Sequence, residues 1–425
     1  MRVLIAVWPL SAHLYPTVAT AWALQAKGHE VRVASHPALV GDITAAGLQA
    51  VALGTPETAP ELSGLMGHML PDAERDALGA ALGVDPDDVN WRTFSSWFLA
   101  SSQIFLPREG AAERDWTSAE ALVSVAERWR PDLVLWDPNL PAAAVAARVS
   151  GAAQARLLWG PDVLGWAVAQ ADGRRAELAA AGLTDPVTEL VAATAHRYRV
   201  QVDRELLLGS FTVDPTPLGM RLGPFGARTL DVRRIPYSGA AEVPPWLLEP
   251  PARPRVAVTL GTTQRSFNND YDIVDTLLQV VDGLDIDAVA TLDDSQLEGR
   301  PVPSNMRVVD FVPLATLLPT CSAIVHHGGI GTLTTAIAHG VPQLVVSRER
   351  AAAYATNAEY VGASGAGLAY DVQTGPEELA KHLLRVLTEP GFVEGADRLQ
   401  REWAAMPTPH ELVDLLEQEV RSARG

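Results

Sequence analysis

A proline-rich segment at residues 235–255, IPYSGAAEVPPWLLEPPARPR, separates two halves of the chain that share one pattern. Because proline fixes φ and lacks a backbone N–H, this segment cannot continue a helix or a central strand. We therefore predict a linker here, between a first domain at residues 1–234 and a second at residues 256–405. Residues 406–425 are predicted to form a helix that crosses back to the first domain.

Short apolar runs alternate with helical patterns in both halves. Such alternation is typical of parallel sheets with helices on both faces, so each half is predicted to be a doubly wound, Rossmann-like α/β domain. We expect the two domains to face each other across a cleft. Residues 54–129 lack the alternation and are predicted to form loops and irregular helices. The predicted strands are Arg2–Trp8, Glu30–Ala34, Leu133–Asp137, Arg156–Trp159, Val256–Leu260, Ala288–Leu292, Met306–Val312, Ala323–His327, Gln343–Ser347 and Gly367–Tyr370, and the best-defined helices are Thr17–Lys27, Ala142–Val149, Thr332–His339 and Pro409–Arg421.

The formal net charge of −18 argues against two classes of partner, nucleic acid and anionic membrane surfaces. The field of such a molecule repels polyanions. No apolar run is long enough to span a bilayer, and the first ten residues, MRVLIAVWPL, resemble a buried strand more than a signal peptide. One cysteine, Cys321, excludes an internal disulfide framework. We therefore expect a cytoplasmic protein.

The tryptophans are concentrated in the first half, because none of the eleven lies between Trp246 and Trp403 and all others precede the linker. Any single tryptophan is expected to belong to the core, where large aromatic side chains are mostly buried. As a group they fit a pocket for a bulky apolar ligand in the first domain.

The stretch HHGGIGTLTTAIAHGVPQLVV at residues 326–346 places two histidines and three glycines between a predicted strand and a helix. At the start of a helix several N–H groups lack partners and the dipole is positive, so a phosphate group is bound well there. Glycines let the backbone approach the oxygens, Thr332 adds a hydroxyl, and His327 adds a donor that can be cationic. The alternative is a glycine-rich turn of purely steric purpose with structural histidines.

A metal site is not predicted. His326 and His327 are adjacent on a strand and therefore point to opposite faces. The acidic pairs Asp285/Asp287 and Asp293/Asp294 flank a predicted strand in a domain that already has a candidate phosphate site.

The glycine-histidine stretch resembles the donor-binding signature of the GT-B nucleotide-sugar glycosyltransferases, in the bacterial branch that glycosylates antibiotics and other natural products. The pattern His-His-Gly-Gly-x-Gly-Thr, followed by Gly-Val/Ile-Pro-Gln, is matched at residues 326–332 and 340–343. The likeness extends to residues 258–262, to residues 311–313 and to His13. The phrases RWRPDLVLWDP and ARLLWGPD are similar to those of the macrolide and anthracycline amino-deoxysugar transferases.

The resemblance implies a donor site for a TDP-sugar, which is a co-substrate, and no cofactor. The signature residues would hold the pyrophosphate, the loop after the first strand of the second domain would approach the same phosphates, and an aromatic residue would lie beside the base. The donor-binding residues implied in this way are Thr262, Thr263, Phe311, Val312, His327, Gly329, Gly331 and Thr332.

Three positions depart from the family pattern. Plant relatives hold the ribose diol with a glutamate where this chain has Thr335, and many relatives have glutamine where it has Leu314. Loss of the glutamate carboxylate at position 335 fits a 2′-deoxyribose, which has only one of the two hydroxyls that the carboxylate would bind, and hence a TDP donor. The acid that contacts the hydroxyls of the transferred sugar is replaced by alanine, at about residues 351–353. Either Glu349 takes its place or the sugar has few hydroxyls, because a buried polar group without a partner is costly.

His13 lies just after the first strand, in Ser11-Ala12-His13-Leu14-Tyr15-Pro16. A lone histidine at such a position is often structural. Its match to the family implies a general base that takes the proton of an acceptor hydroxyl during direct, inverting displacement. Asp137, at the end of a strand, is the candidate to hold the other ring nitrogen. The alternative for Asp137 is a turn or N-cap before Pro138.

Three alternative functions fit parts of the sequence. A nucleotide-sugar epimerase shares the GT-B architecture but needs acids near the sugar, where this chain is rich in alanine. A NAD-dependent dehydrogenase needs Gly-x-Gly-x-x-Gly after its first strand, which residues 11–15 do not offer. A non-catalytic binding or activator protein is favoured by the missing acid and disfavoured by the retained His13 and His327.

The resemblance also implies partners. The acceptor would be a bulky, apolar aglycone of polyketide or macrolide type, and a homodimer is one candidate assembly. Several amino-deoxysugar transferases of this kind act only with a haem-less, cytochrome-like auxiliary protein. The aromatics of Asn90–Phe105 would either contact such a protein or line the acceptor pocket, and we favour the pocket.

Overall fold

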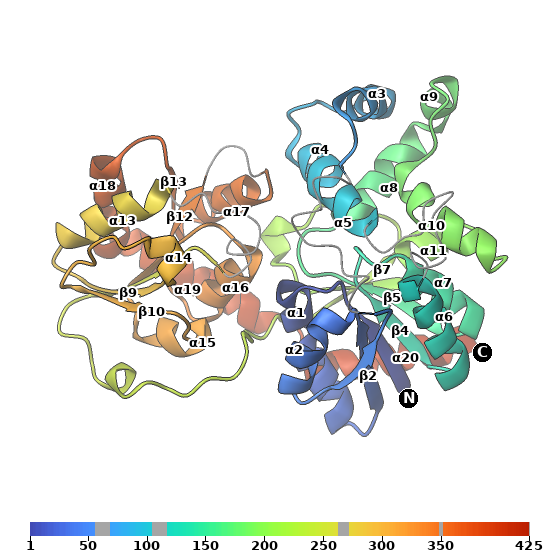
Figure 1. The fold of residues 1–425 in the computed structure, drawn as a ribbon, viewed down its shortest axis with the longest axis horizontal. Helices are drawn as coiled ribbons and strands as arrows, with labels where there is room; N and C mark the ends of the chain where they lie inside the picture. Colours follow the sequence, from blue (N-terminus) through green and yellow to red (C-terminus); the bar gives the residue numbers. More distant parts are fainter. Residues whose placement is uncertain (56–68, 104–116, 262–271, 348–351, 425) are drawn as a thin grey trace. The chain divides into compact units, whose positions relative to one another are not determined.

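The computed structural model describes residues 1–55, 69–103, 117–261, 272–347 and 352–424. Contacts between residues divide the chain into two compact units. Unit 1 comprises Met1–Arg234 together with Pro407–Gly425, and unit 2 comprises Ile235–Met406. Each unit contains one sheet with helices packed around it (Figure 1).

The sheet of unit 1 is parallel throughout, with the strand order β3-β2-β1-β4-β5-β6-β7. The chain builds outward from β1 in one direction and then from β4 in the other, so the topological switch point lies between β1 and β4. These central strands are almost completely buried, as expected for a sheet covered on both faces. The strands are β1 (Arg2–Ala6), β2 (Glu30–Ser35), β3 (Gln49–Ala52), β4 (Leu133–Trp136), β5 (Ala153–Leu157), β6 (Phe211–Asp214) and β7 (Arg228–Asp231).

The helices of unit 1 connect these strands and cover the sheet (Figure 1). They are α1 (Ser11–Ala26), the short η1 (Pro37–Leu39), α2 (Val40–Ala45), α3 (Asp72–Leu82), α4 (Val89–Thr93), the π-helix η4 (Phe94–Phe98), α5 (Leu99–Gln103), α6 (Thr117–Trp129), α7 (Ala142–Ser150), α8 (Val163–Gly173), α9 (Arg175–Ala180), α10 (Pro186–Arg197), α11 (Arg204–Leu208), η6 (Leu218–Met220) and α20 (Pro409–Arg424).

Unit 2 repeats the design with the strand order β10-β9-β8-β11-β12-β13, again all parallel, and its switch point lies between β8 and β11. Its strands are β8 (Arg255–Thr259), β9 (Asp287–Thr291), β10 (Met306–Val309), β11 (Ala323–His326), β12 (Gln343–Ser347) and β13 (Gly367–Asp371). Its helices are η7 (Pro245–Leu248), α13 (Asp272–Asp282), α14 (Asp294–Leu297), α15 (Leu314–Leu317), η8 (Leu318–Thr320), α16 (Ile330–Ala338), α17 (Ala352–Ala363), α18 (Pro376–Thr388) and α19 (Pro390–Ala405).

Helix α1 begins at Ser11, six residues before the predicted start at Thr17. The prediction treated Pro16 as the end of a loop, but Pro16 lies inside the helix. Proline lacks only its own N–H, so Pro16 removes one intrahelical hydrogen bond while the helix continues past it. His13 is therefore in the first turn of a helix and not in a loop.

Two further predictions for the first half were incomplete. Part of residues 54–129, predicted as loops and irregular helices, forms the regular helix α6, which is followed by β4. Strands β3, β6 and β7 were missed because each has only four residues and β3 and β7 mix polar with apolar side chains. In these strands sheet pairing overrides weak local signals.

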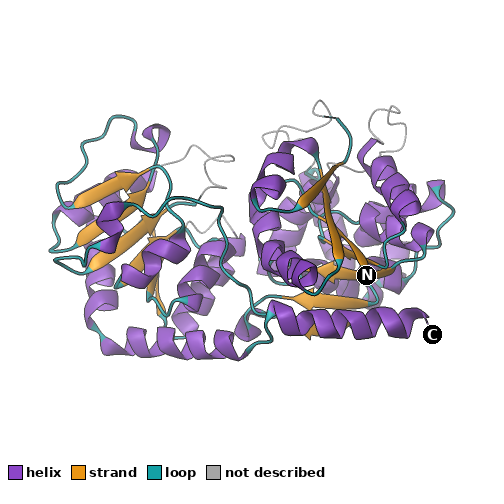
Figure 2. Ribbon diagram, turned by 90° about the horizontal axis from the view of Figure 1, so that it is seen from below, coloured by secondary structure: helices purple, strands orange, loops and turns teal. Residues whose placement is uncertain are grey.

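The C-terminal helix α20 belongs to unit 1, where it contacts α1, β5 and β7. Figure 2 shows it running beside the strands of this unit, with the C-terminus at its far end. Ion pairs from Lys27 to Asp414 (2.6 Å) and from Arg228 to Glu419 join it to the rest of unit 1, and Nε2 of His29 lies 3.1 Å from the carboxylate of Glu417. Its buried apolar face consists of Leu412, Val413, Leu416 and Val420.

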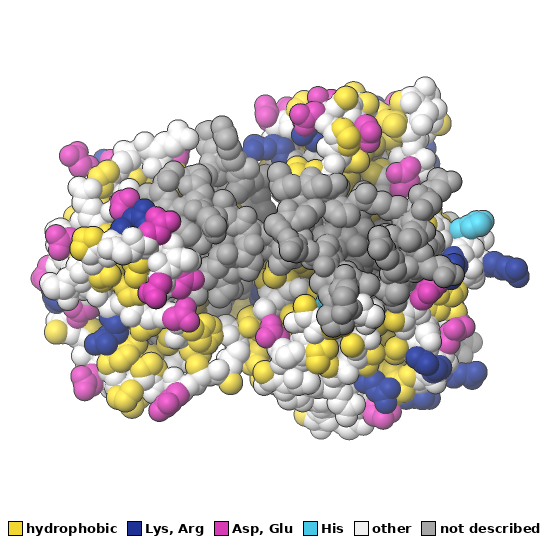
Figure 3. All heavy atoms as spheres, viewed as in Figure 1, with side chains coloured by type: hydrophobic (Ala, Val, Ile, Leu, Met, Phe, Trp, Pro, Cys, Tyr) yellow, Lys and Arg dark blue, Asp and Glu magenta, His cyan; other side chains and the backbone are white. Residues whose placement is uncertain are grey.

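Acidic and basic side chains are interspersed on the face drawn in Figure 3. Where the positions of the residues are described, no helix is long and apolar enough to cross a membrane.

Candidate functional site

His13 and Asp137 lie at the switch point of unit 1. The N–H of His13 bonds to the carbonyl of Leu10 (2.9 Å) as α1 begins directly after β1. Asp137 directly follows β4, and its N–H bonds to the carbonyl of Ala6 at the end of β1 (2.9 Å). Because β1 and β4 are parallel neighbours, both side chains emerge at the carboxyl edge of the sheet.

The imidazole of His13 contacts the carboxylate of Asp137, with 2.7 Å between Nδ1 and Oδ2. Both side chains are 3% exposed. The carboxylate also accepts the backbone N–H of Asn139 on Oδ1 (2.9 Å) and that of Trp8 on Oδ2 (3.3 Å). These donors hold the carboxylate in place, so that it orients the imidazole through Nδ1 and leaves Nε2 on the opposite side of the ring.

Two indole rings flank the imidazole of His13. The ring centroid of Trp8 is 5.1 Å from that of His13, and that of Trp159 is 4.6 Å away. Trp159 lies in the sequence phrase ARLLWGPD, and its indole N–H bonds to Oδ1 of Asn139 (3.1 Å). Trp8, Trp159 and Asn139 were not predicted as site residues. The signal available was their position just after β1, β5 and β4, where functional residues of open parallel sheets gather.

In unit 2, His326 is a structural residue at the end of β11. It is completely buried, its Nε2 lies 3.0 Å from Oε1 of Gln343, and its Nδ1 accepts the N–H of Gly328 (3.1 Å). A ring that accepts on Nδ1 and faces an amide oxygen on Nε2 is the neutral Nε2–H tautomer. Burial lowers the pKa of His326 to about 3, which agrees with this assignment.

His327 occupies a space that two glycines leave open. A Cβ atom on Gly261 would lie 2.2 Å from Cε1 of the imidazole, and one on Gly329 would lie 2.6 Å from Nε2. The ring also packs edge-on against Tyr354, with 5.1 Å between centroids. Gly261 follows β8 and His327 follows β11, so the ring lies at the switch point of unit 2. The glycines of this motif therefore have a steric role around one histidine.

The pKa of His327 is lowered to about 4 by burial, against the opposing effect of a hydrogen bond to the backbone of Thr259. With this pKa the imidazole is neutral near pH 7. Its Nδ1 is buried and has no hydrogen-bond partner among the described residues. The imidazole therefore has one ring nitrogen that no described residue satisfies.

Helix α16 begins at Ile330, two residues before the predicted start, with Gly329 as its N-cap. Glycine offers no side chain to cap the first N–H groups of the helix, so these groups remain available to an anion. Gly331 and Thr332 belong to the first turn and are half-buried. The hydroxyl of Thr335 bonds to the carbonyl of Gly331 (2.7 Å) and so satisfies the helix backbone.

Phe311 and Val312 lie beyond the end of β10, which was predicted to include them. Phe311 is 43% exposed, an unusual position for a large aromatic side chain, whereas Val312 is buried in a core with Val289 and Leu317. Thr262, Thr263, Glu349 and Ala351 lie outside the described residues, and so do the side chains of Ala352 and Ala353. What the sequence predicts for these residues therefore stays a prediction.

The aromatic side chains of α4 and η4 are mostly interior. Trp91, Phe94 and Phe98 are at most 3% exposed, and Phe94 contacts Phe98 and Trp166. Trp97 is half-buried and contacts Trp8, with 6.2 Å between centroids. The described part of residues 90–105 therefore does not present an exposed aromatic surface to a partner protein.

The acidic pairs of unit 2 have structural partners. Asp287 and Asp285 pair with Arg253 (2.6 and 3.5 Å), and Asp293 caps α14. Within the ranges that the structure describes, no three His, Cys, Asp or Glu side chains are grouped as a metal site would require.

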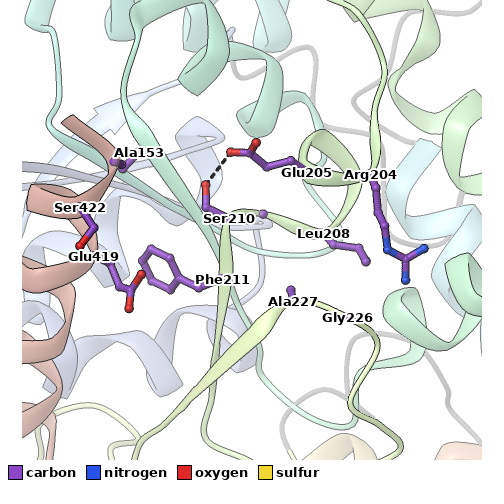
Figure 4. Close-up of a pocket in the computed structure, with 12 residues that line it drawn as sticks. Ala153, Arg204, Glu205, Leu208, Ser210, Phe211, Gly226, Ala227, Glu419 and Ser422 are labelled. Carbon is purple, nitrogen blue, oxygen red and sulfur yellow. Dashed lines mark hydrogen bonds between the residues drawn. The ribbon is translucent and has the colours of Figure 1, made fainter. Parts of the chain in front are cut away.

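A cavity in unit 1 lies at the amino ends of β5, β6 and β7, the edge opposite to His13 (Figure 4). Its charged side chains are paired. Glu205 accepts the hydroxyl of Ser210 (2.7 Å), Glu419 pairs with Arg228, and Arg204 pairs with Asp172. With no unpaired charged group to recognise a ligand, this cavity is not a candidate active site.

Two family models match the chain in sequence order. Residues 22–261 match the N-terminal domain, and residues 275–418 the C-terminal domain, of the family described as erythromycin biosynthesis protein CIII-like. Together the two models span most of the chain.

Characterised relatives match over almost the full length. The chain is 40% identical to the aclacinomycin-T 2-deoxy-L-fucose transferase of Streptomyces galilaeus, over 100% of this chain and 98% of the relative. It is 41% identical to the 10-deoxymethynolide desosaminyltransferase of Streptomyces venezuelae, over 98% of this chain and 96% of the relative.

Solved structures of glycosyltransferases share the fold. The glycosyltransferase VinC, crystallised in complex with DTDP, superposes with a TM-score of 0.81 at 35% identity, over 100% of both chains. The spinosyn forosaminyltransferase SpnP superposes with a TM-score of 0.80 at 34% identity, over 99% of both chains. The expected GT-B fold is confirmed. From the two domain models and these full-length matches, we conclude that this chain belongs to the erythromycin biosynthesis protein CIII-like family and is a glycosyltransferase.

Proposed function

We propose that this enzyme transfers a deoxysugar from a TDP-sugar to a hydroxyl group of a polyketide-derived aglycone, with inversion at the anomeric carbon and without a metal ion. Relatives named as transferases of 2-deoxy-L-fucose, desosamine and mycaminose support the donor and acceptor classes. The observation that carries the chemistry is the buried His13–Asp137 pair at the switch point of unit 1.

In this proposal His13 is the general base. The neutral imidazole takes the proton of the acceptor hydroxyl on Nε2 as the oxygen attacks the anomeric carbon. Asp137, held by two backbone N–H groups, keeps Nδ1–H pointed at its carboxylate and stabilises the imidazolium that forms. The C–O bond to the acceptor forms as the bond to the TDP oxygen breaks, so no nucleophilic side chain is needed.

The donor diphosphate is proposed to lie at the start of α16. The uncapped N–H groups of Gly331 and Thr332, the hydroxyl of Thr332 and the ring of His327 would stabilise the negative charge of departing TDP. Gly329 would allow the backbone to approach the phosphates. The loop that contains Thr262 and Thr263 would approach the same phosphates. Phe311, exposed beside a buried Val312, would stack on the thymine, and the backbone of Val312 would bond to it.

The nucleoside and the sugar are proposed from what the site lacks. Thr335 uses its hydroxyl within the helix, which fits a 2′-deoxyribose that needs no diol-binding carboxylate. The transferred sugar is proposed to be an amino or otherwise highly deoxygenated hexose, with Glu349 as the remaining acid near it. Faster turnover of TDP-glucose than of every TDP-deoxysugar would contradict this part of the proposal.

The transferase names of the relatives support transfer over the epimerase and non-catalytic alternatives. A cytochrome-like auxiliary protein and a homodimer stay predictions from the family resemblance. Purification with and without the products of neighbouring genes, followed by activity measurements, would test both.

The test of the proposed function is the His13→Ala variant. TDP release from TDP-desosamine, TDP-mycaminose and TDP-2-deoxy-L-fucose would be measured with and without tylactone, 10-deoxymethynolide or an anthracycline aglycone. Removal of a general base lowers kcat by about 100- to 10,000-fold, while TDP binding, measured by calorimetry, should not change. Acceptor-dependent TDP release that survives in His13→Ala would contradict the proposal.

A further inference from the structure

Both indole rings that flank His13 are tied to a single polar centre. The indole N–H of Trp8 donates to the carbonyl of Ser101 (2.9 Å), and that of Trp159 donates to Oδ1 of Asn139 (3.1 Å). The two acceptors are joined in turn, because Nδ2 of Asn139 donates to Oγ of Ser101 (2.6 Å). One connected set of hydrogen bonds therefore fixes both rings that contact the imidazole.

The same centre also holds Asp137. The backbone N–H of Asn139 donates to Oδ1 of this carboxylate, and the backbone N–H of Trp8 donates to Oδ2. Ser101 and Asn139 are at most 1% exposed, so bulk water does not replace a bond that is lost. In such a setting the hydrogen bonds of a network support one another, and removal of one member leaves its partners unsatisfied.

Ser101 reaches this centre from a different part of the fold. It lies in α5, which directly follows the π-helix η4. A π-turn contains one more residue than an α-turn, so it rotates every later side chain by about one position around the helix axis. In this position the backbone carbonyl of Ser101 accepts the indole N–H of Trp8, and the Ser101 hydroxyl accepts Nδ2 of Asn139. The aromatic segment that lines unit 1 is thereby connected to the catalytic pair.

We propose that Asn139 and Ser101 are positioning residues for transfer, which hold Trp8 and Trp159 against the imidazole of His13 and thereby fix the direction of its Nε2. This inference rests on the proposed role of His13 as the base. The physical reason is that the ring centroids of Trp8 and Trp159 lie 5.1 and 4.6 Å from that of His13, so contacts with these rings fix the direction of the imidazole only while the rings themselves stay in place. A further bond, from Arg234 to the carbonyl of Trp159 (2.8 Å), holds the backbone of that tryptophan.

The structure offers a matched control for this network. Ser102 is adjacent to Ser101 and equally buried, but its hydroxyl has no hydrogen-bond partner among the described residues. Ser101→Ala and Ser102→Ala thus remove the same atom from the same helix, and only Ser101→Ala breaks the network. Trp159→Phe keeps an aromatic face beside His13 and removes only the indole N–H.

Transfer by Asn139→Ala, Ser101→Ala and Trp159→Phe would be measured with the substrates described above. We expect kcat to fall about 10-fold in Ser101→Ala and in Trp159→Phe, which each remove one bond of the network, and at least as much in Asn139→Ala, which removes two, with the KM values for donor and acceptor within about 2-fold of wild type. Ser102→Ala should retain wild-type kcat. The double variant Ser101→Ala/Asn139→Ala should be no slower than Asn139→Ala alone, because the bond between Asn139 and Ser101 is already lost in Asn139→Ala.

A second measurement does not depend on turnover. In enzyme labelled at histidine Cε1, the NMR signal of His13, assigned by its absence in His13→Ala, should shift in Asn139→Ala and not in Ser102→Ala, because ring currents from both indoles act on it. If Asn139→Ala does not fold, Ser101→Ala and Trp159→Phe carry both measurements.

Equal kcat in Ser101→Ala and Ser102→Ala, losses that appear in KM instead of kcat, or an unshifted His13 signal in the network variants would each overturn the positioning role. This result is distinct from failure of the proposed function. If His13→Ala still transfers sugar, the base itself is wrong. If His13→Ala is inactive while the network variants behave like wild type, only the inference about Asn139 and Ser101 is wrong.

Discussion

Three histidines of this chain, His13, His326 and His327, differ in what their ring nitrogens contact. His13 is held on one side by a carboxylate, His326 has both nitrogens bonded within unit 2, and the buried Nδ1 of His327 has no partner among the described residues. A ring with one nitrogen oriented suits proton transfer, one with both bonded suits structure, and one with a buried unbonded nitrogen suits ligand binding. The adjacent histidines of the signature therefore have different roles.

At the residue scale, we predict that TDP binding protonates His327. Burial lowers the pKa of the free imidazole to about 4 from its ordinary 6.5, and a diphosphate beside the ring would raise it again. Between pH 4 and pH 6.5 the protein with bound TDP then holds more protons than the protein without it. TDP binding should therefore take up protons at pH 6. His327 should also strengthen TDP binding as the pH falls toward 4.

The measurement is titration calorimetry with TDP at pH 6 in two buffers of different ionisation enthalpy, for the wild type and for His327→Asn. The variant keeps the titration of the TDP phosphate itself, so the difference in proton uptake belongs to His327. We expect the variant to bind TDP about 10-fold more weakly, as for loss of a hydrogen bond to a charged group. Equal proton uptake by both proteins would refute protonation of His327.

At the element scale, the junction of β11 and α16 owes its shape to small residues around a ring. Gly328 has φ +92°, a left-handed conformation that strains other residues, and its carbonyl accepts Nδ2 of Asn357 (2.6 Å). Gly329 has φ −62°, which any residue can adopt, so its need for glycine is steric, and the atoms nearest to a Cβ there belong to His327. The two glycines are thus required for different reasons.

We predict that Gly329→Ala weakens TDP binding with little loss of stability. A Cβ atom 2.6 Å from Nε2 forces the imidazole to move, while the backbone angles of residue 329 suit alanine. The expected loss in TDP affinity is about 10-fold or more, measured by calorimetry alongside thermal unfolding. Gly362→Ala is the control, because a Cβ there meets no atom within 4 Å and its position in α17 favours alanine. An affinity for TDP as high in Gly329→Ala as in Gly362→Ala would contradict the prediction.

At the scale of the whole molecule, unit 1 is built from two distant parts of the sequence. Helix α20 follows all of unit 2 in the chain, yet it packs on α1 and on the sheet of unit 1. The backbone N–H of Arg233 also bonds to the carbonyl of Pro407 (2.7 Å), so the segments that leave and re-enter unit 1 are joined. The stability of the unit that carries His13 therefore depends on the last residues of the chain.

We predict that Leu416→Ala destabilises unit 1 by about 2–5 kcal/mol, the usual cost of removing a fully buried leucine side chain. Leu416 is 0% exposed, whereas its neighbour Leu415 is only half-buried, so Leu415→Ala should cost clearly less. Denaturant unfolding followed by tryptophan fluorescence reports on unit 1, where most tryptophans lie. Similar losses in the two variants would show that α20 is not anchored through Leu416.

Much of this protein follows from local sequence. The alternation of apolar runs and helices, the glycine-histidine stretch between β11 and α16, and the amphipathic helix at the end of the chain were all predicted, because periodicity and turn chemistry act over a few residues. The donor signature and the GT-B fold could therefore be predicted from residues 326–343, together with the other segments that resemble the family.

Contacts between distant residues were decided only by the tertiary structure. His13 and Asp137 are 124 positions apart and meet at 2.7 Å because β1 and β4 are neighbours in the sheet. Asn139 and Trp159 are marked only by their positions after strands, and no local signal links either of them to Ser101 until the π-turn and the strand order bring the three residues together. The low pKa of His327 likewise arises from burial, a property of packing that no stretch of sequence states.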